Sequence, residues 1–392
     1  MFRFLTAGES HGPALLAIVE GLPAGLAIDR AAIDSDLRRR QGGYGRGGRM
    51  KIERDAVELL SGVRHGHTLG SPVTLRIENR DWANWTERMS PEPVAEPPEP
   101  VTRVRPGHAD LTGALKYGRG DVRDVIERAS SRETAVRVAV GAVCRQLLAA
   151  FGVAIHSHVL AVGGVGYPEG GEPNLAAADE AFWERVEASE MRCADAGLTA
   201  RMIERILEGK RAGDTCGGVF EVVATSVPVG LGSYSQWDRR LSGRIAQALM
   251  SIPSAKGVEL GGGFALAALS GSRVHDVVRY DTARGWHHLT NNAGGIEGGI
   301  SNGEPIVARV AVKPIPTLAH PLPSADVATG ENVDVTRYER SDVCVVPAAG
   351  VVGEAMLAIA LADAWIEKFA GDSLDEMRRN VAGYLATLTR PL

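Results

Sequence analysis

Apolar residues along the chain occur in two patterns, short runs typical of strands and longer runs with helical spacing. The short runs predict strands at 13–20, 51–62, 71–79, 219–230 and the first part of 306–317. The helical spacing predicts helices at 33–40, 121–151, 177–209 with an interruption near Gly197, 241–250 and 355–369. The order of these elements follows no regular βαβ alternation, and no repeat recurs at a fixed period. This mixture predicts an α+β architecture of packed layers rather than a doubly wound sheet or a barrel.

The segment 90–106, SPEPVAEPPEPVTRVRP, interrupts this pattern with six prolines. Proline disfavours helix interiors and central strands, so we expect an extended, mobile loop there. The long helix that follows has a candidate cap at Asp121 and stops before Gly152.

Composition is that of a globular protein, with 392 residues of which 44% are apolar and 23% charged. The net charge of −5 offers no general attraction to nucleic acid or to an anionic membrane, and we expect neither as a partner. Any anion-binding role must therefore come from local clusters of basic residues. The 47 glycines suggest many turns or close backbone approaches to a ligand.

The cysteines Cys144, Cys193, Cys216 and Cys344 form no CxxC pair, and no histidine pair has zinc-finger spacing, so no metal site is expected. The first twenty residues lack the pattern of a signal peptide, and we find no apolar run of about 18 residues that would span a membrane. We therefore expect a cytoplasmic protein.

The densest basic segment is LRRRQGGYGRGGRMKIER at 37–54, in which five glycines lie among the basic side chains Arg38, Arg39, Arg40, Arg46, Arg49, Lys51 and Arg54. Arginine forks suit phosphate and carboxylate, and glycines let backbone N–H groups approach the same anion. The alternatives are a solvated loop or an RNA-binding arm. A short, internal segment without repeated aromatics disfavours the arm.

Four further stretches carry candidate chemistry. TAGESHGPA at 6–14 places Glu9, Ser10 and His11 between two glycines, which suggests a tight turn that presents a hydroxyl and an imidazole, or simply a polar turn. RPGHAD at 105–110 joins an arginine and a histidine at one turn. RASSRETA at 128–135 could bind phosphate or form a polar helix face, and NNAGGIEGGISNGEP at 291–305 suggests a backbone-lined ligand loop.

Several common motifs are missing from the sequence. It contains no P-loop, no dinucleotide-binding GxGxxG between a strand and a helix, no GxSxG elbow and no HExxH. The residues alone therefore predict a cytoplasmic α+β enzyme with a pocket rich in arginine, histidine and glycine for a multiply anionic small molecule.

These motifs, together with RRRQGGYGR and ERSDVCVVPAAGVVGEAMLAIALADA, occur in an order that resembles the chorismate synthase family from Phe4 to Phe369. The resemblance implies a β-α-β layered sandwich forming a single domain over 1–392, with the mobile loop at about 90–106 and a C-terminal tail at about 370–392. It also implies a homotetramer.

The resemblance further implies a reaction, the 1,4-anti elimination of phosphate from 5-enolpyruvylshikimate 3-phosphate to give chorismate, the last step of the shikimate pathway. Such enzymes require reduced FMN although no net redox change occurs. The chain shows no separate reductase module, so an external flavin reductase is implied. A substrate with one phosphate and two carboxylates would account for the many arginines.

Catalytic roles follow by matching family motifs. His11 matches a histidine that can protonate the departing phosphate, and His108 one near the N1–C2=O edge of the flavin. Ser10 matches a hydroxyl near both ligands. Asp342 matches a carboxylate proposed to work with flavin N5 in taking up the C6 proton.

The remaining matches concern binding. FMN contacts are implied for Arg128, Ala129, Ser130, Pro253, Ser254, Gly298, Lys313, Pro314, Ile315, Pro316, Thr317 and Arg340. Substrate contacts are implied for Arg49, Arg105 and Arg132. Arg40 and Arg46 match positions tied to NADPH, a possible source of reducing equivalents.

The chain departs from the family pattern in three places. Ala129 replaces a hydroxyl, Ser341 and Val343 replace a histidine and a proline beside Asp342, and Pro253 stands where an amide is usual. Other hypotheses are a flavin oxidoreductase acting on a shikimate-like acid, a non-catalytic binding protein on the same scaffold, and an RNA-binding protein, which strongly salt-sensitive binding would reveal.

Overall fold

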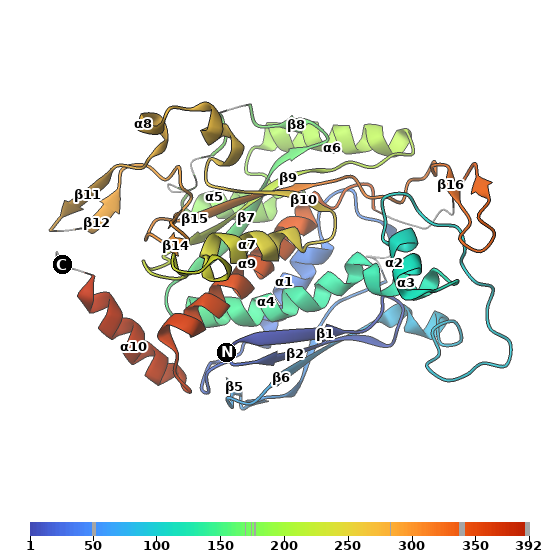
Figure 1. Ribbon diagram of the computed structural model, residues 1–392, viewed down its shortest axis with the longest axis horizontal. Helices are drawn as coiled ribbons and strands as arrows, with labels where there is room; N and C mark the ends of the chain where they lie inside the picture. The colour runs from blue at the N-terminus through green and yellow to red at the C-terminus, as the bar shows by residue number, and fades with distance from the viewer. Residues whose placement is uncertain are drawn as a thin grey trace.

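The computed structural model describes residues 1–48, 52–168, 170–173, 175, 178–282, 284–336 and 342–388 (Figure 1). Its α-helices are α1 (Arg30–Gln41), α2 (Asp110–Tyr117), α3 (Arg123–Ala129), α4 (Thr134–Ala149), α5 (Glu180–Ala188), α6 (Ala196–Arg211), α7 (Leu241–Met250), α8 (Gly271–Val274), α9 (Val346–Phe369) and α10 (Leu374–Thr387). Short 3₁₀ turns include η2 (Arg80–Asn84) and η3 (Ser131–Glu133).

Two antiparallel sheets contain the longer strands. The four-stranded sheet has the order β1-β2-β6-β3 and the five-stranded sheet the order β10-β15-β9-β7-β8. Their strands are β1 (Arg3–Ala7), β2 (Ala14–Glu20), β3 (Val57–Ser61), β6 (Val73–Glu78), β7 (Ala154–Val162), β8 (Val165–Gly166), β9 (Gly218–Thr225), β10 (Ala255–Leu260) and β15 (Ile306–Val312). Small pairs are β4 (Val63–Arg64) with β5 (His67–Thr68), β11 (Val278–Asp281) with β12 (Gly285–His288), β13 (Ile296–Glu297) with β14 (Ile300–Ser301), and β16 (Ser324–Ala325) with β17 (Asn332–Val333).

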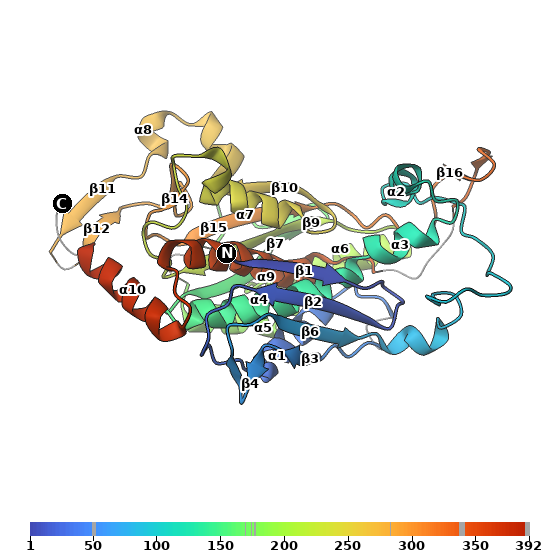
Figure 2. The same cartoon turned by 60° about the horizontal axis from the view of Figure 1, so that its bottom comes forward.

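Helices α4 and α9 lie between the two sheets. α4 packs on β2 and β6 of the first sheet, α9 packs on β7 and β9 of the second, and α4 and α9 pack against each other (Figure 2). Sheet, helices and sheet therefore form successive layers, which confirms the expected α+β sandwich. Beyond one end of the helical layer, α2 and α3 lie beside the β16–β17 pair.

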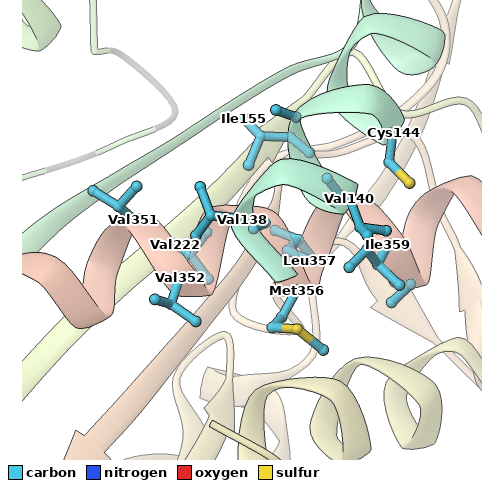
Figure 3. Close-up of a cluster of buried hydrophobic side chains, with 14 of the residues drawn as sticks. Val138, Val140, Cys144, Ile155, Val222, Val351, Val352, Met356, Leu357 and Ile359 are labelled. Atoms are coloured by element: carbon cyan, nitrogen blue, oxygen red, sulfur yellow. The ribbon is translucent and has the colours of Figure 1, made fainter. Parts of the chain in front are cut away.

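The core is centred on α9, whose valine, leucine, isoleucine and methionine side chains meet those of α4 and β9 (Figure 3). The close approach depends on glycines. A Cβ on Gly141 of α4 would lie 2.3 Å from the Cβ of Ala355, and one on Gly353 would lie 2.4 Å from the ring of Phe220. Apolar packing at this density supplies the main stabilisation of the layered fold.

α9 corrects two predictions. It begins at Val346 rather than at residue 355, with Pro347 in its first turn, a position that proline tolerates. It is also long and apolar enough to cross a membrane, although we expected no such run. Because 94% of its most apolar stretch is buried inside the protein, it is a core helix.

Other predicted boundaries also shift. The helix predicted over 121–151 breaks at Ser130, where the backbone is extended (ψ 140°) and the hydroxyl accepts a hydrogen bond from the Arg132 N–H. The interruption within 177–209 lies between α5 and α6, at 189–195, and Gly197 is helical. The tail at 370–392 contains α10, and the strand predicted at 51–62 is limited to β3. The prediction at α7 is confirmed residue for residue.

Candidate active site

A cavity of about 680 Å³ opens where α4 and α9 begin. Eight segments remote in the sequence contribute to its wall, including the β1–β2 turn, the end of α1 and the turn before α2. The predicted site residues that line it are Ser10, His11, Arg40, Arg46, Arg105, His108, Ala129, Ser130, Arg132, Pro253, Ser254, Lys313, Ile315, Pro316, Thr317 and Asp342. The structure therefore brings His11, His108 and Asp342, the three residues with expected proton-transfer roles, to one cavity.

Three predicted contacts do not line the cavity. Arg128 is exposed and donates to the carbonyls of Gly8 and Thr6. Gly298 lies in the β13–β14 turn near Tyr234, and Pro314 is exposed. The predicted residues Arg49 and Arg340, with the departure at Ser341, lie outside the described residues.

The β1–β2 turn that carries Ser10 and His11 is held from two directions. The Asn79 side chain donates to the carbonyls of Glu9 (3.0 Å) and Gly12 (2.8 Å). From α3, the carbonyl of Glu127 accepts from the Ser10 N–H at 2.9 Å. These hydrogen bonds hold the turn between Gly8 and Gly12 in a defined conformation, which fixes the backbone that carries Ser10 and His11.

We expect Gly8→Ala to disrupt this turn. Gly8 has φ +103°, and an added Cβ would lie 2.3 Å from the carbonyl oxygen of Ala14. Such strain costs about 1–3 kcal/mol, so the free energy of unfolding measured in urea should fall by that amount, and turnover should fall with it. Gly12→Ala is the matched control, because its Cβ would meet only the flexible Glu9 side chain at 3.1 Å. Equal losses in both variants would contradict the prediction.

His11 is oriented by a buried carboxylate. Its Nδ1 lies 2.8 Å from Oε2 of Glu127, whose side chain is 1% exposed. Burial alone would raise the pKa of Glu127, but the hydrogen bond from His11 and the charge of Arg123 outweigh it and lower that pKa. The ring also stacks on Trp85, with centroids 3.8 Å apart. His11 therefore enters the cavity in one defined orientation.

His108 has a similar arrangement. Its Nδ1 hydrogen-bonds to the fully buried carboxylate of Asp110, which Arg105 binds through Nε at 2.8 Å. Burial opposes ionisation of Asp110, yet His108 and Arg105 together hold its pKa well below the usual range. Each histidine thus has its Nδ1 on a buried carboxylate, an arrangement that leaves Nε2 to interact with a ligand.

The arginines of the site differ in how their donors are used. Arg132 is 3% exposed and its donors bind Asp55 (2.6 Å) and Asn79 (3.0 Å). Arg40 is 4% exposed and, among the described residues, its Nη1 has no hydrogen-bond acceptor, with Asp55 3.6 Å away. Burial, together with the charges of Arg132 and Arg46, lowers the pKa of Arg40 to about 9. An anion beside Arg40 would relieve this cost.

The glycine-rich segment after α1 positions Asp342. Its carboxylate accepts from the Gly47 N–H at 2.5 Å and pairs with Nη1 of Arg46 at 2.9 Å. Ser254 and Lys313 form another part of the cavity wall. Ser254 adopts φ +72° in the turn before β10, and its carbonyl accepts from the Lys313 N–H. Lys313 in turn donates through Nζ to the carbonyl of Gly107. A strained non-glycine residue in a cavity wall is typical of functional sites.

The sequence analysis did not identify three residues that contact the two histidines: Asp110, Glu127 and Trp85. Asp110 belongs to the RPGHAD motif itself, and Glu127 precedes RASSRETA by one residue, so both were available as candidate partners. Trp85 lies in the stretch after η2, which carried no predicted role. Among described residues, the cavity wall holds seven basic side chains, two histidines and only the carboxylates of Asp81 and Asp342. The site is therefore suited to a multiply anionic ligand.

Comparisons with known proteins show the family of the chain. A family model described as chorismate synthase matches residues 2–366. A chorismate synthase of Geotalea daltonii is 56% identical over 396 residues, covering 99% of each chain. One of Symbiobacterium thermophilum is 54% identical over 394 residues, covering 99% of this chain and all of that protein. A crystal structure of a chorismate synthase superimposes with a TM-score of 0.81 at 44% identity, covering 99% of this chain and 98% of the other. The chain therefore belongs to the chorismate synthase family, and it is an enzyme of the lyase class.

Proposed function

We propose that the enzyme eliminates phosphate from 5-enolpyruvylshikimate 3-phosphate in a 1,4-anti sense to give chorismate, the last step of the shikimate pathway. The observation that carries this proposal is the convergence of seven basic side chains and two carboxylate-held histidines on one cavity. A substrate with one phosphate and two carboxylates needs several fixed cations to offset its lost hydration.

Arg40 is the side chain most directly poised for such an anion, because its buried Nη1 lacks an acceptor among the described residues. Arg105 and Arg132 are the proposed substrate contacts, but their guanidinium groups already donate within the protein. Arg105 binds Asp110 and Thr317, and Arg132 binds Asp55, Asn79 and the Glu78 carbonyl. We infer that these two arginines act mainly through the charge that they place in the wall. Arg49 is a third proposed substrate contact, which rests on the family motif alone.

Reduced FMN is the proposed cofactor, and when bound it would lend electron density to the reaction without net redox change. The cavity supports this fit with apolar walls for a flat ring system, from Ile252, Ile315 and Val345, beside basic groups for a phosphate. The proposed contacts that line the cavity are Ala129, Ser130, Pro253, Ser254, Lys313, Ile315, Pro316 and Thr317.

The proton-handling residues have distinct proposed roles. His11 protonates the departing phosphate through Nε2, since Glu127 engages Nδ1. Asp342, fixed by Gly47 and Arg46, takes part in removing the C6 proton. His108 would lie beside bound FMN and would influence its protonation, and Ser10 would place a hydroxyl near both ligands.

The wider setting is also a proposal. We infer a cytoplasmic homotetramer of single-domain chains that receives reduced flavin from an external reductase, with NADPH as the source of electrons. Arg40 and Arg46, which the family motif ties to NADPH, both lie in the same cavity wall as His11. A nicotinamide contact would therefore be made at this cavity.

An anaerobic assay tests the reaction. With reduced FMN and 5-enolpyruvylshikimate 3-phosphate, we expect one inorganic phosphate per chorismate formed, while the absorbance of the reduced flavin is the same at the end as at the start. A flavin oxidoreductase would instead oxidise one flavin per turnover. Flavin oxidation in proportion to product, or no phosphate release, would contradict the proposed function.

A further inference from the structure

Glu127 contacts the turn that carries His11 through both of its carboxylate oxygens and its backbone carbonyl. Oε2 accepts from the His11 backbone N–H at 2.9 Å and lies 2.8 Å from Nδ1. Oε1 lies 3.1 Å from Nδ1 and accepts from Nη1 of Arg123 at 3.1 Å. The carboxylate is thus shared between one imidazole and one guanidinium, in a setting from which water is nearly excluded.

The surroundings of the His11 ring add a second constraint. Trp85 stacks on it with an interplanar angle of 19°, and the Trp85 indole N–H donates to Asp81 at 3.2 Å. The guanidinium groups of Arg88 and Arg123 lie 5.7 and 5.4 Å from the Trp85 ring centroid. Among the described residues, the charged groups that contact His11 or Trp85 are Glu127 and Arg123 from α3, Asp81 from η2, and Arg88 from the stretch after it.

We propose that Glu127 is a positioning residue for His11, which keeps a proton on Nδ1 and directs Nε2 toward the ligand. A carboxylate that accepts from one ring nitrogen fixes the tautomer and the ring orientation, and it stabilises the imidazolium when the second nitrogen takes a proton. The catalytic consequence rests on the proposed function, in which His11 protonates the leaving phosphate through Nε2. The tautomer itself does not depend on that function.

The contact pattern distinguishes this role from a purely structural one. A glutamate that served only to anchor the turn would need the backbone N–H of His11 and the Ser10 N–H, both of which it already binds. The contact to Nδ1 does more than hold the turn, because it favours the tautomer whose proton lies on that nitrogen. A structural role therefore predicts no effect on the tautomer, whereas a positioning role requires one.

The first test uses the unmodified protein. With ¹⁵N-labelled histidine, and with His11→Asn to assign the signal, the ring nitrogen shifts of neutral His11 report its tautomer at alkaline pH. We expect the Nδ1–H form to predominate. The Nε2–H form, which free imidazole side chains favour in water, would overturn the proposal whatever any variant does.

The second test compares Glu127→Gln with Glu58→Gln. Glu58 is the control, since both of its carboxylate oxygens accept from Arg76 and it does not line the cavity. In Glu127→Gln we expect kcat to fall about 10–100-fold, the loss seen when carboxylates that support metal-binding histidines are removed, with KM changed less than threefold and a mixed His11 tautomer. The control should retain the parental values. If Glu127→Gln keeps both the parental kcat and the parental tautomer, the proposal is wrong.

The two proposals fail separately. If the unmodified enzyme releases no phosphate, the proposed function falls, and the tautomer of His11 still decides whether Glu127 positions the ring. If phosphate is released and His11 is in the Nε2–H form, the function stands and the role of Glu127 is lost.

Discussion

Replacing His108 with alanine is expected to lower kcat by about 10²–10⁴-fold, the usual contribution of a positioned acid–base group. His108 lines the cavity, and its side chain is 18% exposed, so a ligand can reach Nε2 while Nδ1 remains on Asp110. The fold should persist, because the Arg105–Asp110 ion pair at 2.8 Å survives without the imidazole. The loss should therefore appear in turnover rather than in stability.

The measurement is the rate of anaerobic phosphate release at saturating substrate, with the thermal midpoint recorded in parallel. His320→Ala is the matched control, because that imidazole is exposed and, within the described part of the chain, its one hydrogen bond is to the carbonyl of Ala212. We expect the control to match the parent in both quantities. A His108→Ala enzyme within threefold of the parental kcat would remove His108 from the proton-handling residues.

Much of the fold was predictable because local patterns determine it. β2 and α7 lie within one residue of their predicted bounds, because the spacing of apolar residues within each segment matches the face that it buries. The start of α9 was missed because Gly350 and Gly353 weaken the helical signal. Those glycines are required by tertiary packing, as the contact of Gly353 with the Phe220 ring shows. Glycine lowers the intrinsic helix propensity of a segment, so helix propensity alone does not predict a helix whose glycines are needed for packing against other elements.

The break at Ser130 has a similar origin. The apolar spacing continues across it, but a hydroxyl that caps a following N–H competes with the helix. The break also shapes the cavity wall, because the chain after it places Ser130, Ser131 and Arg132 along the cavity. It leaves Arg128 in the preceding helix with an exposed side chain.

The site residues were predictable by type but not by partner. The arginines of the sequence motifs do gather at one cavity, but Arg132 is paired with Asp55, 77 residues away. No spacing rule reveals such a pair. The same holds for His11 and Glu127, which are separated by 116 residues and meet only because α3 docks on the β1–β2 turn. Partners this remote in the sequence are set by topology and only the structure identifies them, whereas Asp110 lies two residues from His108 in the same motif.

Glu354→Gln is expected to lower the free energy of unfolding by about 3–5 kcal/mol, the cost of removing one partner from a buried ion network. The carboxylate of Glu354, 1% exposed in the middle of α9, binds Arg39 (2.8 Å) and Arg192 (2.9 Å). Arg145 lies 3.2 Å away, and Ser157 donates to the same carboxylate at 2.7 Å. A neutral amide would leave three guanidinium groups around it without their shared counter-charge.

The pH dependence follows from the same contacts. Burial disfavours the ionised form of Glu354, but the charges of Arg39, Arg192 and Arg145 outweigh it and hold its pKa far below the ordinary value. A carboxylate with a lowered native pKa contributes stability above its unfolded pKa of about 4.3, and this contribution is lost as the pH falls below that value. The difference in stability between the parent and Glu354→Gln should therefore be largest near neutral pH and shrink on acidification.

Urea unfolding at neutral and at acidic pH measures both effects. Glu204→Gln is the control, because Glu204 is 55% exposed in a surface pair with Arg211 at 2.9 Å, which is worth about 0–1 kcal/mol. A Glu354→Gln loss no larger than that of the control would mean that the network is already compensated by Asp36 and Glu187, which contact the same arginines. A loss that is large and independent of pH would instead point to packing of the side chain rather than to its charge. Only a large loss that diminishes in acid identifies the carboxylate as the counter-charge on which the helical layer depends.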